Sequence, residues 1–132
     1  MKGSHVIADF WGCSFDLLDD LNKLRESLVI AANLAHATVI DTITHKFTPQ
    51  GVTILVLLSE SHISIHTTPE DGYASFDCYT CGDTCNPELG FEYIRSVLQP
   101  KSYRITKLDR GENPQSSTSL NWPVGATGLV LQ

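Results

Sequence analysis

One peptide bond near the middle of the chain joins residue types that can cleave a protein backbone without a second molecule. Glu60 is followed by Ser61, and two histidines, His62 and His66, come soon after. A serine hydroxyl can attack the carbonyl that precedes it and convert the amide into an ester. Elimination from the serine half of this ester, followed by hydrolysis, leaves a pyruvoyl ketone at a new chain start. That ketone condenses with an amine and acts as an electron sink, so an amino acid can be decarboxylated without a bound cofactor.

A Glu-Ser dipeptide by itself is most often an ordinary polar step between two strands, so the residues around it decide the interpretation. Residues 60–67 read Glu-Ser-His-Ile-Ser-Ile-His-Thr, and they are followed by Pro69-Glu70, Gly72-Tyr73-Ala74 and residues 77–82. This run closely resembles the processing region of the bacterial-type S-adenosylmethionine decarboxylase family. The similarity extends more loosely from Gly12 to about Leu108, and residues 111–132 lie outside it.

The resemblance implies a proenzyme that cuts itself between Glu60 and Ser61 into chains 1–60 and 61–132. Ser61 would become the pyruvoyl group, form a Schiff base with S-adenosylmethionine and decarboxylate it. The product would be the aminopropyl donor for spermidine synthesis. The resemblance further implies a homodimer of processed protomers with the ligand site near their interface.

Three further residues receive chemical roles from the resemblance. His66 would transfer protons during ester formation and elimination, although strand alternation alone places it on the opposite face from Ser61. Cys81 would protonate the α-carbon of the substrate after carbon dioxide leaves, and a free thiol, which titrates near pH 8.5, suits this task in its neutral form. Thr53 stands where the family usually has a serine that assists processing. The ordinary alternatives are a buried, hydrogen-bonded histidine and a plain buried cysteine. His62 is assigned a structural role.

Substrate binding would fall to Phe47, which matches an aromatic that stacks on adenine, and to Glu70, which matches a carboxylate that binds the ribose hydroxyls. The ordinary alternatives are a core phenylalanine and a solvated glutamate in a turn. Thr68 departs from the family, which commonly has an aromatic there, and a lost stacking contact costs about 1 to 3 kcal/mol. This departure keeps two other functions open: a pyruvoyl-dependent decarboxylase of a smaller amino acid such as ornithine or arginine, and an unprocessed, non-catalytic partner subunit.

The cysteines allow a metal hypothesis that their spacing does not favour. Cys78, Cys81 and Cys85 are close in sequence, but Cys78 and Cys81 lie three apart on a predicted strand and therefore on opposite faces, unlike the pair of a zinc knuckle. No metal is expected. Without a secretory signal the protein is predicted to be cytoplasmic, so these three residues and Cys13 are expected to be free thiols.

Length and charge exclude some partners. The 132 residues suit one domain, predicted to span 1–110, with a loop or disordered tail at 111–132. The net charge is −6, from 15 acidic and 9 basic residues, with no basic cluster, which argues against nucleic-acid binding. No apolar stretch reaches membrane-spanning length.

The hydrophobic pattern predicts the elements that must position these residues. Two amphipathic helices are expected, one starting at Ser14 or Asp16 and continuing to Ala32, the other starting at Asn86-Pro87 and ending near Leu98. The expected strands are 5–11, 38–47, 52–58, 61–67, 73–80 and 102–108. The order β-α-β-β followed by β-β-α-β predicts an α+β fold, a two-layer α/β sandwich whose mostly antiparallel sheet carries its helices on one face.

Overall fold

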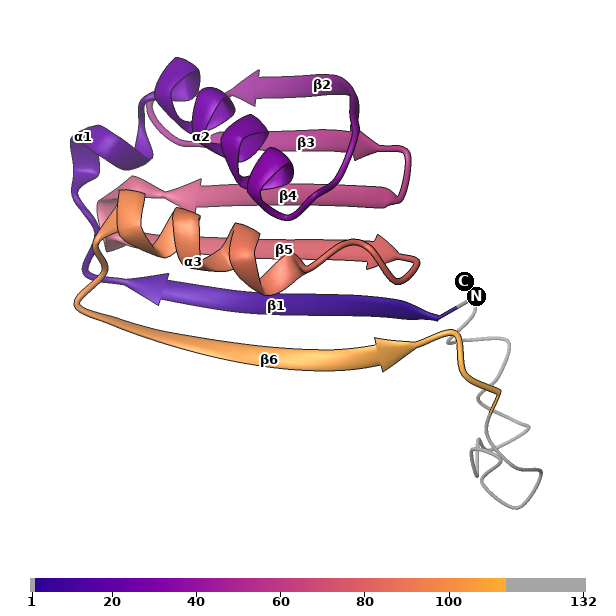
Figure 1. Ribbon diagram of the computed structural model, residues 1–132. Coiled ribbons are helices and arrows are strands. Elements are labelled where there is room, and N and C mark those ends of the chain that lie inside the picture. The colour runs from indigo at the N-terminus through magenta and orange to yellow at the C-terminus, as the bar shows by residue number, and fades with distance from the viewer. Residues whose placement is uncertain (1, 114–132) are drawn as a thin grey trace, which may run out of the picture.

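A computed structural model describes residues 2–113 of the chain (Figure 1). The predicted tail at 111–132 therefore lies, except for its first three residues, outside the described part. The elements follow in the order β1 (Gly3–Trp11), α1 (Phe15–Leu18), α2 (Leu21–Leu34), β2 (Val39–Lys46), β3 (Val52–Leu58), β4 (Ser61–Thr68), a 3₁₀ turn (Pro69–Asp71), β5 (Tyr73–Cys81), α3 (Pro87–Leu98) and β6 (Ser102–Arg110).

The six strands of residues 2–113 form one antiparallel sheet in the order β2-β3-β4-β5-β1-β6. The strands β1, β2 and β3 precede the Glu60-Ser61 bond, and β4, β5 and β6 follow it. Strand β1 thus lies between β5 and β6 (Figure 1). The predicted α+β sandwich with an antiparallel sheet is confirmed.

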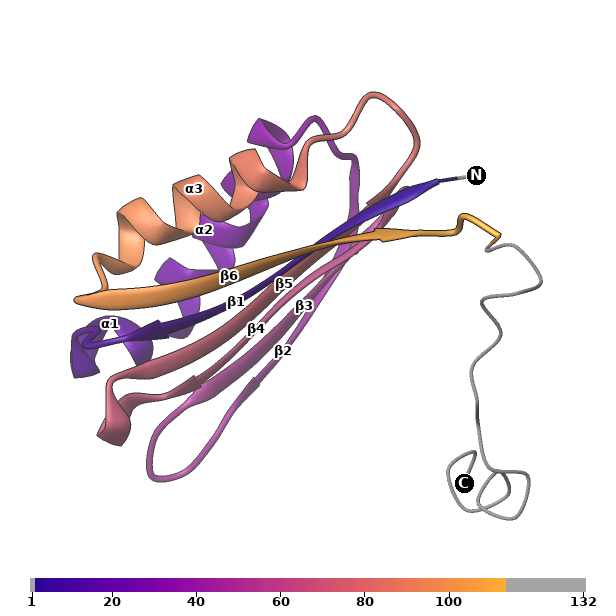
Figure 2. The same cartoon turned by 90° about the horizontal axis from the view of Figure 1, so that it is seen from below.

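Helices α2 and α3 pack on one face of the sheet, and no described element covers the other face, here called the open face (Figure 2). Strand alternation produces this division. In β3, Val52, Ile54 and Val56 are fully buried under the helices, whereas Leu55 and Leu57 on the open face are about half exposed (47% and 52%). Among the described residues, no helix is both long and apolar enough to cross a membrane.

Capping residues determine where α2 and α3 begin, and the cap of α2 corrects one predicted helix. Asn86 accepts a hydrogen bond from the Glu88 amide and starts α3, as expected. The single helix predicted from Ser14 to Ala32 is wrong, because two helices occupy that stretch. Asp20 accepts the Lys23 amide at 3.0 Å and so caps a new helix after α1.

The Asp9 carboxylate, on the open face of β1, is expected to stabilise the fold above about pH 4. It accepts hydrogen bonds from the Tyr73 hydroxyl at 2.5 Å and the Arg104 guanidinium at 3.1 Å, and chiefly the Tyr73 bond holds the pKa of Asp9 below its usual range. This stabilisation is complete above the unfolded pKa of about 3.9 and is lost as the pH falls through the lower, folded value.

We therefore expect Asp9→Asn to lower the free energy of unfolding by about 1 kcal/mol at pH 6 and by less at pH 2. Urea denaturation in a Ser61→Ala background, which would keep the chain in one piece, measures both values. Equal losses at the two pH values would contradict this assignment.

Candidate active site

The Glu60-Ser61 bond lies in the tight turn between β3 and β4, where Leu58 pairs with Ser61. Ser61 has a φ of 145°, in a region that residues other than glycine rarely adopt. Such a backbone conformation costs about 1 to 3 kcal/mol and persists only where the surrounding structure enforces it. The strain is therefore located at the residue whose preceding bond is predicted to break.

The Glu60 carbonyl, which the serine would attack, is held and polarised. It accepts a hydrogen bond from the Cys81 backbone amide at 2.9 Å. The Glu60 carboxylate in turn accepts bonds from the Thr38 amide at 2.9 Å and the Thr38 hydroxyl at 3.2 Å, which fixes the turn. An amide donor on the carbonyl oxygen can stabilise negative charge that develops there during attack.

Cys81 lies at the end of β5, and its side chain is half-buried on the open face. Cys78 lies on the helix side, where burial raises the pKa of its thiol to about 12. The prediction that these two cysteines lie on opposite faces is thus confirmed, and all four cysteines are free. Cys81, Glu60 and Ser61 line one open depression of about 750 Å³. We call these three residues the cleavage end.

Four other predicted residues gather at the opposite end of β4 and are called the binding end. Thr53 pairs with His66 across β3 and β4, and its hydroxyl lies 2.7 Å from His66 Nδ1. The Phe47 and His66 rings form a T-shaped pair, with centroids 5.7 Å apart. Glu70 follows in the 3₁₀ turn and is exposed.

The structure does not bring His66 to Ser61 within one chain. Strand β4 runs without a break from Ser61 to Thr68, so no turn folds one residue back onto the other. Five residues of extended strand separate them by about 16 Å. The residues predicted for one active site therefore form two groups on each chain.

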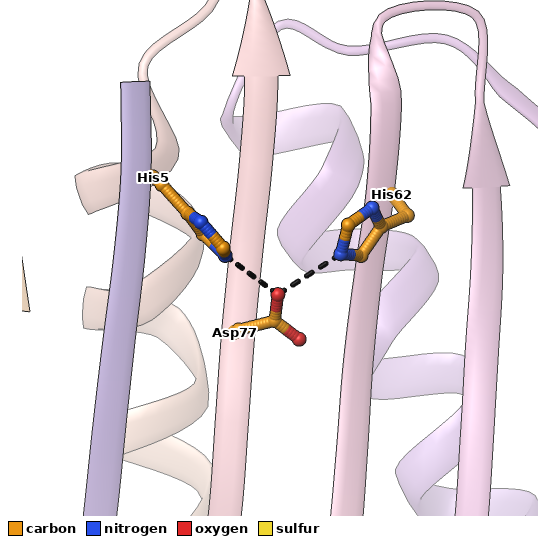
Figure 3. A group of neighbouring side chains, drawn as sticks. All are labelled: His5, His62 and Asp77. Atoms are coloured by element: carbon orange, nitrogen blue, oxygen red, sulfur yellow. Dashed lines mark hydrogen bonds and ion pairs between the residues drawn. The ribbon is translucent and has the colours of Figure 1, made fainter. Parts of the chain in front are cut away.

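A third group, centred on Asp77, was not anticipated from the sequence (Figure 3). His5 Nε2 lies 2.7 Å and His62 Nε2 lies 2.9 Å from the same oxygen, Asp77 Oδ2. The Ser64 hydroxyl donates to Asp77 Oδ1. Burial opposes ionisation of this carboxyl, but the hydrogen bonds from Ser64, His5 and His62 outweigh it and lower the pKa of Asp77.

His5, His62 and Asp77 have the composition of a two-histidine, one-carboxylate cation site, but in this structure they are joined to one another by hydrogen bonds. The ligand atoms of His5, His62 and Asp77 all lie within 4.8 Å of one another. Both Nε2 atoms already have the Asp77 carboxylate as a hydrogen-bond acceptor. The sequence offered one signal, since alternation placed His62 and Ser64 on the same face, but it gave no indication of the partners on β1 and β5.

Comparison with known proteins identifies the family to which this geometry belongs. A family model described as S-adenosylmethionine decarboxylase matches residues 4–111. The chain belongs to the S-adenosylmethionine decarboxylase family. It is 53% identical over 109 residues to S-adenosylmethionine decarboxylase proenzyme 2 of Bacillus cereus, covering 83% of this chain and 89% of that protein. It is 50% identical over 109 residues to the proenzyme of Brevibacillus brevis, covering 83% and 82% of the two chains.

Solved structures of the family agree with this assignment. The crystal structure of the adenosylmethionine decarboxylase from Aquifex aeolicus superposes with a TM-score of 0.79 at 39% identity, covering 89% of this chain and 97% of that one. The adenosylmethionine decarboxylase of Trypanosoma brucei superposes with a TM-score of 0.56 at 17% identity, covering 77% and 44%, which shows a likeness of fold alone.

Membership of a family of decarboxylase proenzymes confirms the resemblance from which the pyruvoyl group was inferred. The residues fit the formation of that group from Ser61. The serine is strained, and the carbonyl before it accepts a backbone hydrogen bond. The individual roles predicted for Thr53, His66 and Cys81 remain predictions.

Proposed function

We propose that the chain cleaves itself between Glu60 and Ser61 and then decarboxylates S-adenosylmethionine with the pyruvoyl group derived from Ser61. This proposal rests on the arrangement of the residues at the cleavage end. A strained serine follows a carbonyl that accepts the Cys81 amide, and the Cys81 thiol lines the same depression. The relatives named as decarboxylase proenzymes support the same reaction.

The cleavage end provides for the first steps of processing. Ser61 Oγ attacks the Glu60 carbonyl carbon, and the Cys81 amide stabilises the negative charge on the carbonyl oxygen. Collapse breaks the bond between Glu60 and the Ser61 nitrogen, which takes up a proton, and leaves an ester. Release of the Ser61 φ from its unfavourable value contributes to this step. Loss of the Ser61 α-proton then expels the Glu60 carboxylate, and water converts the resulting dehydroalanine to the ketone with release of ammonia.

In turnover the pyruvoyl group supplies the electron sink for decarboxylation. Cys81 is placed to deliver the proton that the substrate α-carbon needs afterwards. Its side chain is half-buried at the depression that also contains Ser61. A thiol is a far better acid than a serine hydroxyl, which suits it to this transfer.

A second copy of the chain would join the two ends into one active site. The open face carries exposed apolar side chains on the edge strand β2 and its neighbour β3, including Ile43, Leu55 and Leu57 at 66%, 47% and 52% exposure. Uncovered apolar patches of this kind mark interaction surfaces. Two sheets that stack face to face about 10 Å apart, related by a two-fold axis that runs between them and perpendicular to the strands, would place the cleavage end of one copy against the binding end of the other.

The binding end favours a nucleoside substrate. Phe47 lies against the rings of His45 and His66, with centroids 4.5 and 5.7 Å away, so an aromatic surface remains although Thr68 replaces the family aromatic. Glu70 follows His66 closely in the sequence, and its exposed carboxylate is available for ribose hydroxyls. The absence of an aromatic ring at Thr68 is the feature that keeps ornithine or arginine as the second candidate.

Two measurements on the purified protein test this proposal. Intact mass under denaturing conditions is expected to give fragments 1–60 and 61–132, the second gaining two hydrogens on borohydride reduction of its ketone. Release of labelled carbon dioxide from carboxyl-labelled S-adenosylmethionine, ornithine and arginine then identifies the substrate. A chain that stays intact would favour the alternative in which the protein is a non-catalytic partner subunit. Carbon dioxide release from ornithine or arginine alone would favour a decarboxylase of a smaller amino acid.

A further inference from the structure

We infer that His62 is the general base for ester formation at Ser61 and that Asp77 is its positioning residue. This inference rests on the self-cleavage proposed above. The Ser61 hydroxyl oxygen lies 3.1 Å from His62 Nδ1, and His62 Nε2 lies 2.9 Å from Asp77 Oδ2. Serine, imidazole and carboxylate thus form a continuous chain that ends at the nucleophile.

Hydrogen-bond chemistry determines which nitrogen of His62 is basic. An ionised carboxylate only accepts, and Asp77 already accepts the Ser64 hydroxyl at its other oxygen, so the His62 Nε2 atom carries the hydrogen that Asp77 binds. In the neutral imidazole the other nitrogen, Nδ1, then has a free lone pair directed at the Ser61 hydroxyl. This is the protonation state that a base needs before the attack.

His5 supports the carboxylate on its other side. Arg110 Nη1 lies 3.3 Å from His5 Nδ1 and can only donate, so the His5 hydrogen is on Nε2 and points to Asp77 Oδ2. With Ser64 on the second carboxylate oxygen, Asp77 on β5 is held by side chains from both neighbouring strands, β1 and β4, and Figure 3 shows both imidazoles converging on it. The two imidazoles differ in one respect, because only His62 contacts the reacting serine.

The strained backbone explains how adjacent residues on a strand can meet. Alternation would direct the Ser61 and His62 side chains to opposite faces. The φ of 145° at Ser61 departs from regular strand geometry at the position where its hydroxyl contacts the His62 ring. Within one chain, in contrast, His66 lies about 16 Å along the strand from Ser61 and contacts Thr53.

Ester formation needs no proton donor or acceptor other than Ser61 and His62. The Ser61 hydroxyl proton moves to His62 Nδ1 as the bond from Ser61 Oγ to the Glu60 carbonyl carbon forms. The same proton then passes to the Ser61 nitrogen as the bond from Glu60 to that nitrogen breaks. His62 ends the step neutral, as it began, and the charge on Asp77 does not change.

Hydroxylamine separates ester formation from the later elimination, because it cleaves an ester but not the original amide. His62→Asn removes the base, and its self-cleavage is expected to slow by about 10²- to 10⁴-fold. It should accumulate no hydroxylamine-sensitive ester, whereas His66→Ala, if it is blocked at elimination, should accumulate one. Fragment masses after hydroxylamine treatment give both results. Added imidazole should restore cleavage to His62→Gly, which a structural role of His62 would not permit.

His36→Asn is the matched control, since His36 lies outside this group and has a φ of 63° that asparagine tolerates. It should cleave as the wild type does. His62→Gln, whose amide can still bond Asp77, carries the test if His62→Asn does not fold. If the wild type cleaves and either His62 variant cleaves equally fast, the inference is wrong but the proposed function stands. The same conclusion follows if either variant accumulates a hydroxylamine-sensitive ester. A wild-type chain that remains intact overturns the proposed function as well.

Discussion

Two variants that are each inactive, Ser61→Ala and His66→Ala, are expected to yield active protein when they are coexpressed. Each chain carries a cleavage end and a binding end, about 16 Å apart along β4. If a complete site takes one end from each copy, a mixed dimer contains one site with both Ser61 and His66 intact. Random pairing makes about half of the dimers mixed, each with one working site of two, so about a quarter of wild-type activity should return.

Carbon dioxide release and fragment masses measure this complementation on the unfractionated mixture, and mixed dimers purified through two different tags should show about half of wild-type activity. Ser61→Ala with Cys81→Ser provides the control, because both changes lie at the cleavage end and no pairing of these chains restores a complete site. Activity that returns in the first mixture and not in the second supports the shared site. No recovery in the first mixture would show that the proposed arrangement of the two copies is wrong.

Cys81→Ser is expected to separate processing from turnover. Its backbone amide remains able to bond the Glu60 carbonyl, so the chain should still cleave. The serine hydroxyl is too weak an acid to replace the thiol, and kcat should fall by about 10²- to 10⁴-fold. Protonation at the wrong carbon would also convert the ketone to an amine, so the residual activity should decline during turnover.

Mass spectrometry of the 61–132 fragment and the time course of carbon dioxide release follow both effects of Cys81→Ser. Cys85→Ser is the matched control, because the Cys85 thiol contacts the His36 carbonyl at 3.4 Å and is not among the residues that line the depression. Wild-type kcat in the Cys81 variant would remove Cys81 from the proposed proton transfer.

Local patterns predicted the fold well, because alternation and capping depend on neighbours in the sequence. The alternating sequence of β4 predicted that Ile63 lies on the buried face and His62 on the open face. The start of α3 at Asn86 was also predicted from its capping residue. The break before α2 was not, since the whole stretch keeps helical spacing and only the cap at Asp20 interrupts it.

The candidate site was predictable only in part. Resemblance supplied the residue types, but the distance from Ser61 to His66 depends on β4 being uninterrupted. The contact between His5 and Asp77 joins residues 72 positions apart and requires the pairing of β1 with β5. Long-range register of this kind leaves no periodic signal in the sequence.

Because of the strand order, cleavage at Glu60-Ser61 changes refolding from a process of one chain into an association of two. Fragment 1–60 contributes β1 between β5 and β6 of fragment 61–132, while β3 pairs with β4 across the cut. The two pieces therefore stay together without a covalent link for as long as the sheet persists. Once unfolded, the precursor can refold as one chain at any dilution, whereas the cut protein must first reunite two molecules. Its recovery should then depend on protein concentration.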